Sequence, residues 1–207
     1  MKLYDISPVI HPGIAVWPGD TLFTRRELLR LCDGAPVNLS SVTLSLHTGA
    51  HMDAPLHVLA DAMSIDLLDL AAFLGPARVV TRNNVDSIQE ADLHSILEQK
   101  PERLLIRCRR EYDPDRFPPA VTWFTEQAAT RIAEAGVRLI GTDEPSVDPI
   151  DSTDLPAHKA FARGGTVILE SVDLRSVPDG EYELIALPLR IQGGDASPVR
   201  AILREMG

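Results

Sequence analysis

The stretch "LHTGAHMDAPLH", residues 46–57, decides how the fold and the chemistry of this sequence are interpreted. It contains His47, His51 and His57, three of the six histidines of the chain, together with Asp53. Imidazole nitrogens and carboxylate oxygens are ligands that zinc, manganese and related divalent ions bind. We therefore predict that His47, His51 and Asp53 hold a metal ion. Three protein ligands without a cysteine leave one position for water, which is typical of catalytic zinc sites.

The residues between these side chains predict a loop rather than a helix. Gly49 would cost about 1 kcal/mol in a helix interior, and Pro55 lacks the amide hydrogen that a continuous helix needs. A fully extended backbone would separate the Cα atoms of His47 and His51 by about 13 Å, which is too far for both rings to share one ion comfortably. We expect Gly49 to supply the bend that brings the two rings together.

Two simpler interpretations compete with a catalytic metal site. Loop histidines often make only ordinary hydrogen bonds, and His57 could be a satisfied polar residue behind Leu56. Three histidines and an aspartate within eleven positions favour metal binding over that alternative. A regulatory protein that binds metal without catalysis is the alternative from a different functional class, and it leaves His57 without a role.

Length and composition predict one globular domain. The chain has 207 residues with no linker, repeat or change of composition, so we predict a single domain over residues 1–207. The net charge is −10, and the basic residues are scattered apart from a short cluster at Arg107, Arg109 and Arg110. Nucleic-acid and anionic-membrane partners need concentrated positive charge, so we expect neither.

The cysteines and the first residues bear on the cellular location. Cys32 and Cys108 are too few and too far apart for a disulfide scaffold, so we expect two reduced thiols. Asp5 and Pro8 interrupt the apolar core that a signal peptide would need, and no apolar run approaches the length of a membrane span. We therefore expect a cytoplasmic protein.

Hydrophobic patterns predict mostly strands. Residues 39–46 alternate Val42, Leu44 and Leu46 with hydroxyl side chains, which predicts a strand with one buried face that ends where the histidine motif begins. Six further segments are rich in branched residues and bounded by turn formers, which also predicts strands. They cover residues 78–82, 103–108, 137–143, 166–170, 183–189 and 199–204.

Helices are fewer. Residues 125–136 have Thr125 as a capping residue, alanines at helical spacing and Gly136 as a stop, and residues 90–99 form the second good candidate. The chain is therefore expected to be mixed α/β, with more strand than helix.

Several segments beyond the histidine motif carry a resemblance to a known family. They are "WPGD" at 17–20, "NLSSVTLSLHTGAHMDAPLH" at 38–57, "TDEPSVDPID" at 142–151 and "YELIALPLRIQGGDASPVRAILR" at 182–204. Together, over nearly the whole chain, they resemble the cyclase-type metal-dependent hydrolases. Ala50 stands where most of that family has threonine, which affects the wall of the site and leaves the ligands in place.

The resemblance implies a binuclear zinc site. By matching motif positions, His47, His51 and Asp53 would hold one zinc ion, while Asp53, His158 and Glu170 would hold a second, so that Asp53 bridges the two. Residue type alone does not reach this result. An isolated histidine such as His158 is more often a surface residue, and Glu170 by itself would be interpreted as a solvated strand end.

The resemblance also implies an activity. The matching family members hydrolyse the formamide of N-formyl-L-kynurenine to L-kynurenine and formate in tryptophan degradation. His57 would then be the catalytic proton-transfer residue, and Trp17 would contact the substrate, with core packing as the alternative for Trp17. A related hydrolase that acts on another amide or on a lactone is the closest alternative, since the metal motif alone does not select the substrate.

The resemblance implies a fold and an assembly as well: an α/β domain of the swivelling β/β/α type with mixed sheets and few helices, in a homodimer whose neighbouring subunit can reach the pocket. We do not expect Asp143, Asp148 or Asp151 to bind metal, because aspartates beside serine and proline more often cap turns. The segment "GGDASPVR", residues 193–200, likewise has the composition of a turn.

Overall fold

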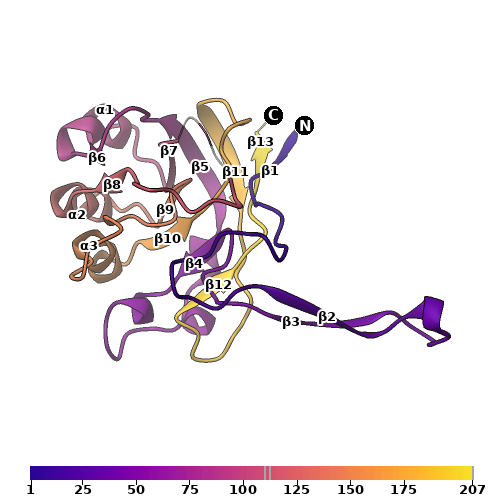
Figure 1. The fold of residues 1–207 in the computed structure, drawn as a ribbon. Helices are drawn as coiled ribbons and strands as arrows, with labels where there is room; N and C mark the ends of the chain where they lie inside the picture. Colours follow the sequence, from indigo (N-terminus) through magenta and orange to yellow (C-terminus); the bar gives the residue numbers. More distant parts are fainter. Residues whose placement is uncertain (110, 112, 207) are drawn as a thin grey trace.

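The computed structural model describes residues 1–109, 111 and 113–206, and within them the chain forms one large mixed sheet of nine strands (Figure 1). In order across the sheet the strands are β1 (Leu3–Asp5), β13 (Ile202–Glu205), β11 (Gly180–Ile185), β5 (Leu74–Thr81), β7 (Arg103–Arg107), β9 (Leu139–Thr142), β10 (Val167–Glu170), β4 (His51–Asp53) and β12 (Ala196–Pro198). The four central strands, β5, β7, β9 and β10, run parallel to one another. All other pairs in the sheet are antiparallel. The sheet therefore brings strands from both ends of the sequence together with strands from its middle.

Helices cover one face of the parallel strands (Figure 1). These are α1 (His94–Leu97), α2 (Glu126–Glu134) and α3 (Pro156–Gly164), and they are accompanied by the 3-10 turns η1 (Leu31–Asp33), η2 (Pro55–His57), η3 (Ile65–Leu67), η4 (Leu70–Ala72) and η5 (Glu90–Leu93). The Thr125 hydroxyl accepts a hydrogen bond from the amide of Ala128 at 3.2 Å, which caps α2 as predicted. Two small ribbons complete the fold: β2 (Thr24–Leu29) with β3 (Leu39–Thr43), and β6 (Ser87–Ile88) with β8 (Trp123–Phe124).

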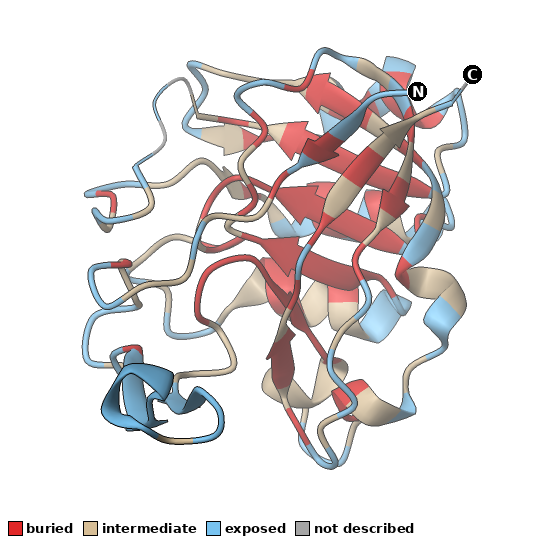
Figure 2. Cartoon of the chain, turned by 90° about the vertical axis from the view of Figure 1, so that its right-hand side faces the viewer, coloured by how far each residue is buried: buried red, intermediate tan, exposed pale blue. Residues whose placement is uncertain are grey.

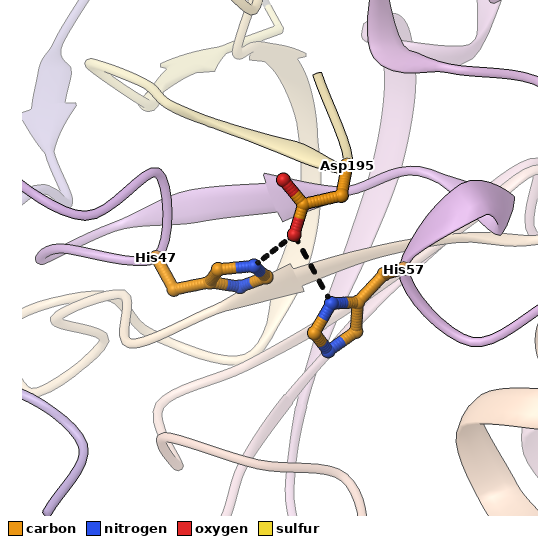
Figure 3. Close-up of side chains that lie close together, drawn as sticks. All are labelled: His47, His57 and Asp195. Atoms are coloured by element: carbon orange, nitrogen blue, oxygen red, sulfur yellow. Dashed lines mark hydrogen bonds and ion pairs between the residues drawn. The ribbon is translucent and has the colours of Figure 1, made fainter. Parts of the chain in front are cut away.

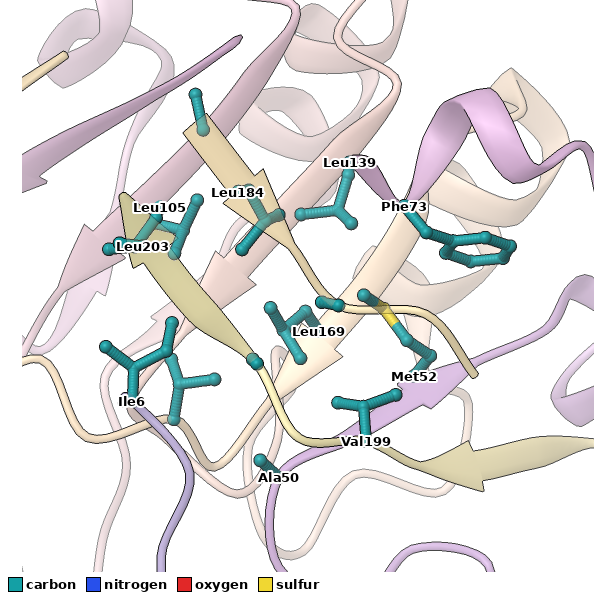
Figure 4. Packing of buried hydrophobic residues seen from close by; sticks show 14 of the residues in the cluster. Ile6, Ala50, Met52, Phe73, Leu105, Leu139, Leu169, Leu184, Val199 and Leu203 are labelled. Atoms are coloured by element: carbon teal, nitrogen blue, oxygen red, sulfur yellow. The ribbon is translucent and has the colours of Figure 1, made fainter. Parts of the chain in front are cut away.

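Both faces of the central strands are buried (Figure 2). One face packs on a cluster that includes Met52, Leu105 and Leu203 (Figure 4), and the other packs under the helices against residues such as Ile132 and Phe161. Burial on two sides explains why strands such as β9 and β10 consist of nearly continuous apolar residues without alternation.

The prediction for residues 39–46 is half right. β3 forms at Leu39–Thr43, but every one of its residues is exposed, and Val42 retains 55% of its accessible surface. The expected buried face is wrong, because β3 pairs only with β2 in a ribbon that projects away from the large sheet (Figure 1).

The other sequence predictions agree better with the structure. All six further strands are present, although β11 ends at Ile185 rather than at residue 189, and β13 begins at Ile202 rather than at residue 199. Residues 90–99 form η5 followed by the short α1, whereas the helix α3 was not predicted. Mixed α/β architecture with more strand than helix is confirmed.

Cys32 and Cys108 are both free thiols, as expected. Among the described residues no helix is long and apolar enough to cross a membrane.

Arg103 holds the turn before β5 from inside the protein, with only 2% of its surface exposed. Its guanidinium donates hydrogen bonds to the carbonyls of Ala71, Ala72 and Pro76. We expect Arg103→Met to lower the free energy of unfolding by about 3 kcal/mol, because it leaves buried carbonyls without donors. Urea titration checks this, with Arg131→Met on the exposed side of α2 as the control. A loss no larger than that of the control would contradict the role of Arg103.

Candidate metal centre and active site

The histidine motif folds as a bent loop followed by a short strand. Gly49 has φ +66°, which supplies the predicted bend between His47 and His51. The prediction of a loop is wrong beyond residue 50, since His51–Asp53 forms β4, which pairs with both β10 and β12. The 3-10 turn at Pro55–His57 then carries His57 back toward the same place.

Strand register and one helix bring the more distant residues to the motif. In the antiparallel pair of β10 and β4, Glu170 lies directly opposite His51, so their side chains share one face of the sheet. His158 comes from the first turn of α3 and is buried. All five predicted ligands therefore lie together, including the two that residue type alone would have placed at the surface.

The two carboxylate oxygens of Asp53 face two groups of side chains. Oδ1 lies 3.0 Å from Nδ1 of His47 and 3.5 Å from Nε2 of His51. Oδ2 lies 3.6 Å from Nε2 of His158, and this nitrogen is 3.4 Å from Oε1 of Glu170. Nε2 of His51 is also 3.4 Å from Oε2 of Glu170, which connects the two groups. Asp53 thus occupies the central position that a bridging ligand would need.

The donor atoms fit divalent metal ions. Within the described part of the chain, Nε2 of His51 and both oxygens of Asp53 are buried without a hydrogen-bond partner. Unpartnered buried polar atoms are costly unless an ion satisfies them. Ligand atoms about 2.0 Å from a tetrahedral ion are separated by about 3.3 Å, close to the separations in this cluster. Side chains of His47, His51 and Asp53 can place three ligand atoms within 4.8 Å of one another.

The partners of the ring nitrogens leave the right atoms available for metal. Nδ1 of His51 donates to the carbonyl of Gly49 at 2.9 Å, since a carbonyl can only accept. Nδ1 of His158 donates to Oδ2 of Asp148 at 2.6 Å. In both rings Nε2 keeps its lone pair and faces the cluster. Hydrogen bonds of this kind orient histidine ligands in metal sites.

The charges of the cluster are strongly coupled. Burial by itself would lower the pKa of His47, but hydrogen bonds and charges from Asp53 and Asp195 raise it to about 9. Burial would raise the pKa of Asp53, yet the electrostatic attraction of the nearby His158, His47 and His51 rings holds it well below its ordinary value. Metal ions bind neutral imidazole, so binding must release protons from these histidines.

A cavity of about 380 Å³ opens onto the cluster and is lined by His47, His51, His57, His158 and Glu170. Trp17 and Phe117 also line the cavity, and their rings meet edge to face with centroids 5.2 Å apart. Trp17 is 37% exposed, so core packing does not describe its position. His57 can place a ring nitrogen within 4.8 Å of ligand atoms of Asp53 and His158. Flat apolar walls beside polar groups suit an aromatic substrate.

Of the three aspartates that we did not expect to bind metal, Asp143 and Asp148 are buried and accept hydrogen bonds, whereas Asp151 is exposed. Asp143 accepts backbone hydrogen bonds from Cys108 and Arg109 after β7, and Asp148 accepts them from Ala157 and His158 in the first turn of α3, so both bind amides of other segments rather than of their own turn. Asp148 does more than the sequence indicated, because it also orients the His158 ring. Asp151 is exposed.

Asp195 is the residue that sequence reasoning missed. It lies in the segment interpreted as a turn, yet its Oδ2 is 3.0 Å from Nε2 of His47 and 3.4 Å from Nδ1 of His57 (Figure 3). The only sequence signal was that residues 182–204 share in the family resemblance. A separation of 138 positions from His57 gives no local pattern to follow.

Residues 4–149 match the family model described as "Putative cyclase", which covers more than half of the chain. The chain belongs to this cyclase family. The family expected from the histidine motif is thereby confirmed.

Two curated proteins are similar to this chain over nearly their full length. A protein of Salinibacter ruber named "Kynurenine formamidase" is 48% identical over 99% of this chain and 98% of that protein. A protein of Bacillus cereus with the same name is 42% identical over 97% of this chain and 96% of that protein. A solved structure described as a "predicted metal-dependent hydrolase from Bacillus stearothermophilus" is 27% identical, with a TM-score of 0.84 over 98% of this chain and 97% of that one. The α/β fold with mixed sheets and few helices that the resemblance implies agrees with this structural similarity.

Proposed function

We propose that this chain is a kynurenine formamidase, which hydrolyses N-formyl-L-kynurenine to L-kynurenine and formate in tryptophan degradation. The observation that carries the proposal is the full-length similarity to proteins of that name, at 48% and 42% identity. The site supports it because an aromatic-walled cavity opens onto a buried cluster of metal-type ligands.

The residues fit two zinc ions bridged by Asp53. In this proposal His47, His51 and Asp53 hold one ion, and Asp53, His158 and Glu170 hold the other. When bound, such ions lower the pKa of water toward about 7 and polarise the formyl oxygen. Asp53 lies between the two groups and would partly neutralise the repulsion between two cations. Both carboxylate oxygens of Asp53 would thereby also gain the partners that their burial demands.

His57 is proposed to move the proton. It would take a proton from the water that attacks the formyl carbon and deliver it to the arylamine nitrogen as the carbon–nitrogen bond breaks. The products are the free amine and formic acid, which gives its remaining acidic proton to solvent and leaves as formate. Its side chain is 29% exposed and lines the cavity, so its ring can reach both water and substrate. An imidazole suits both steps because its ordinary pKa of about 6.5 is near the working pH.

Trp17 is proposed to stack on the aminophenyl ketone of the substrate. We expect Trp17→Ala to raise KM about tenfold, because losing one aromatic contact costs about 1.4 kcal/mol, while kcat changes little. Steady-state kinetics check this, with Leu67→Ala, another exposed apolar residue, as the control. A KM equal to that of the unaltered protein would contradict the assignment.

The direct test is hydrolysis of N-formyl-L-kynurenine by the purified protein, measured before chelation, after chelation and after zinc is added back. Activity that is lost and then restored is the expected result. A folded, zinc-loaded protein without this activity would discard the formamidase proposal, and hydrolysis of other amides or lactones would then favour the alternative substrate class. Bound zinc that changes only stability would favour a protein without catalysis.

We also propose that the protein is a homodimer. The ribbon of β2 and β3 projects from the body (Figure 1), and a set of its large apolar side chains is exposed in the single chain. The set is Leu28, Leu29, Leu31, Val37, Leu39 and Val42. A second copy that covers them would remove this apolar surface from water. Sedimentation equilibrium should give twice the chain mass of 22.6 kDa, and a single-chain mass would contradict the proposal.

The cytoplasmic location stays a prediction.

A further inference from the structure

One carboxylate oxygen connects a proposed zinc ligand with the proposed proton-transfer residue. Oδ2 of Asp195 lies 3.0 Å from Nε2 of His47 and 3.4 Å from Nδ1 of His57, and Figure 3 shows it between the two rings. The two rings are themselves close, with centroids 4.4 Å apart. Nothing in the mechanism proposed above uses this oxygen.

Main-chain hydrogen bonds fix Asp195 independently of the histidines. Its carbonyl accepts a hydrogen bond from the amide of Ala54 at 2.9 Å. The preceding Gly194 carbonyl accepts one from the amide of Ile65 at 2.9 Å, and the amide of Gly193 donates to Oδ1 of Asp66 at 3.0 Å. The loop therefore presents the carboxylate at a set position.

The position of this carboxylate decides which ring nitrogens carry hydrogen. An ionised carboxylate only accepts hydrogen bonds, so Nε2 of His47 and Nδ1 of His57 must be the donors. In neutral rings the lone pairs then lie on Nδ1 of His47 and Nε2 of His57. Nδ1 of His47 is the atom that faces Asp53, at 3.0 Å. The same hydrogen bonds leave Nε2 of His57 as the atom able to accept a proton.

We propose that Asp195 is a positioning residue that fixes the tautomers of both rings through one oxygen, and so prepares His47 to bind metal and His57 to accept a proton. The His57 part rests on the proposed function, whereas the His47 part requires only that the cluster binds metal. The comparable partners of the other two histidines, Gly49 and Asp148, each serve a single ring.

Asp195→Ala tests the inference. The side chain is 46% exposed and the main-chain bond to Ala54 remains, so we expect the variant to fold. Zinc affinity, measured by competition with a chromophoric chelator, should fall 10- to 100-fold, as for other partners of ligating histidines. At saturating zinc, turnover should fall at least tenfold. Asp86→Ala removes an exposed carboxylate away from the cavity and should change neither quantity.

A second comparison separates the two roles. In a His57→Ala background at saturating zinc, Asp195→Ala should cause no further loss of turnover, while zinc affinity still falls. Nitrogen-15 NMR of the zinc-loaded protein should show the hydrogen on Nδ1 of His57, and in Asp195→Ala it should move to Nε2 in a large fraction of molecules. If Asp195 only supported the loop, its removal would lower turnover equally with and without His57, and the hydrogen would stay on Nδ1 of His57.

The outcomes distinguish the inference from the proposed function. Unchanged zinc affinity and unchanged turnover in Asp195→Ala would overturn the inference, and so would an equal loss of turnover with and without His57. Absence of formylkynurenine hydrolysis in the unaltered protein would overturn the proposed function alone, since zinc affinity and the NMR signal would still test Asp195. If the alanine variant does not fold, Asp195→Ser provides the same measurements.

Discussion

Asp53→Asn is expected to abolish zinc-dependent hydrolysis, with a loss of at least about 10³-fold in turnover. Metal ions contribute several kcal/mol to stabilising the transition state, and about 4 kcal/mol corresponds to a factor of 10³. Asp53 faces both groups of proposed ligands through its two oxygens, so one substitution weakens both ion sites. Asparagine keeps the shape of the side chain and removes the negative charge between the histidines.

Three measurements check this expectation. Zinc content of the purified protein should fall from the proposed two ions per chain toward zero, activity should not return when zinc is added, and added zinc should no longer raise the melting temperature. Asp69→Asn is the matched control, because it is the same substitution at an exposed residue that caps η4. Full zinc content in Asp53→Asn would contradict the bridging position.

The features that could be predicted from the sequence are those that depend on neighbouring residues. The cap of α2 at Thr125 and the bend at Gly49 follow from intrinsic preferences, and both are present. The alternation in residues 39–46 correctly indicates a strand. It does not indicate burial, because a period of two shows only that one face is more apolar than the other. Which surface covers that face depends on contacts outside the strand.

The site shows the same division. His47, His51 and Asp53 are close in sequence, so residue types and spacing alone predict them as metal ligands. Glu170 joins them only through the pairing of β10 with β4, which no local pattern specifies, and the family resemblance supplied it. Asp195 and Asp148 contact the rings of the histidines. Turn-forming neighbours surround both aspartates, and this composition indicated turns, although a turn and an orienting carboxylate can be the same residue.

His57→Ala provides the second large effect, and it is expected to separate proton transfer from metal binding. His57 lines the cavity, makes its contact to Asp195 through Nδ1 and belongs to none of the proposed ligand sets. General acid–base groups typically contribute 10²- to 10⁴-fold, so turnover should fall at least about 10²-fold. Zinc content and KM should stay close to those of the unaltered protein, because the five proposed ligands remain.

His94→Ala is the matched control for this substitution, because that side chain is 83% exposed on α1, on the helical layer. It should leave turnover, KM and zinc content unchanged. If His57→Ala lost zinc together with activity, His57 would be a ligand rather than a proton carrier, and near-normal turnover would remove it from the mechanism. Low turnover with unchanged KM and with the proposed two zinc ions retained is the combination expected of a proton-transfer residue beside an intact metal centre.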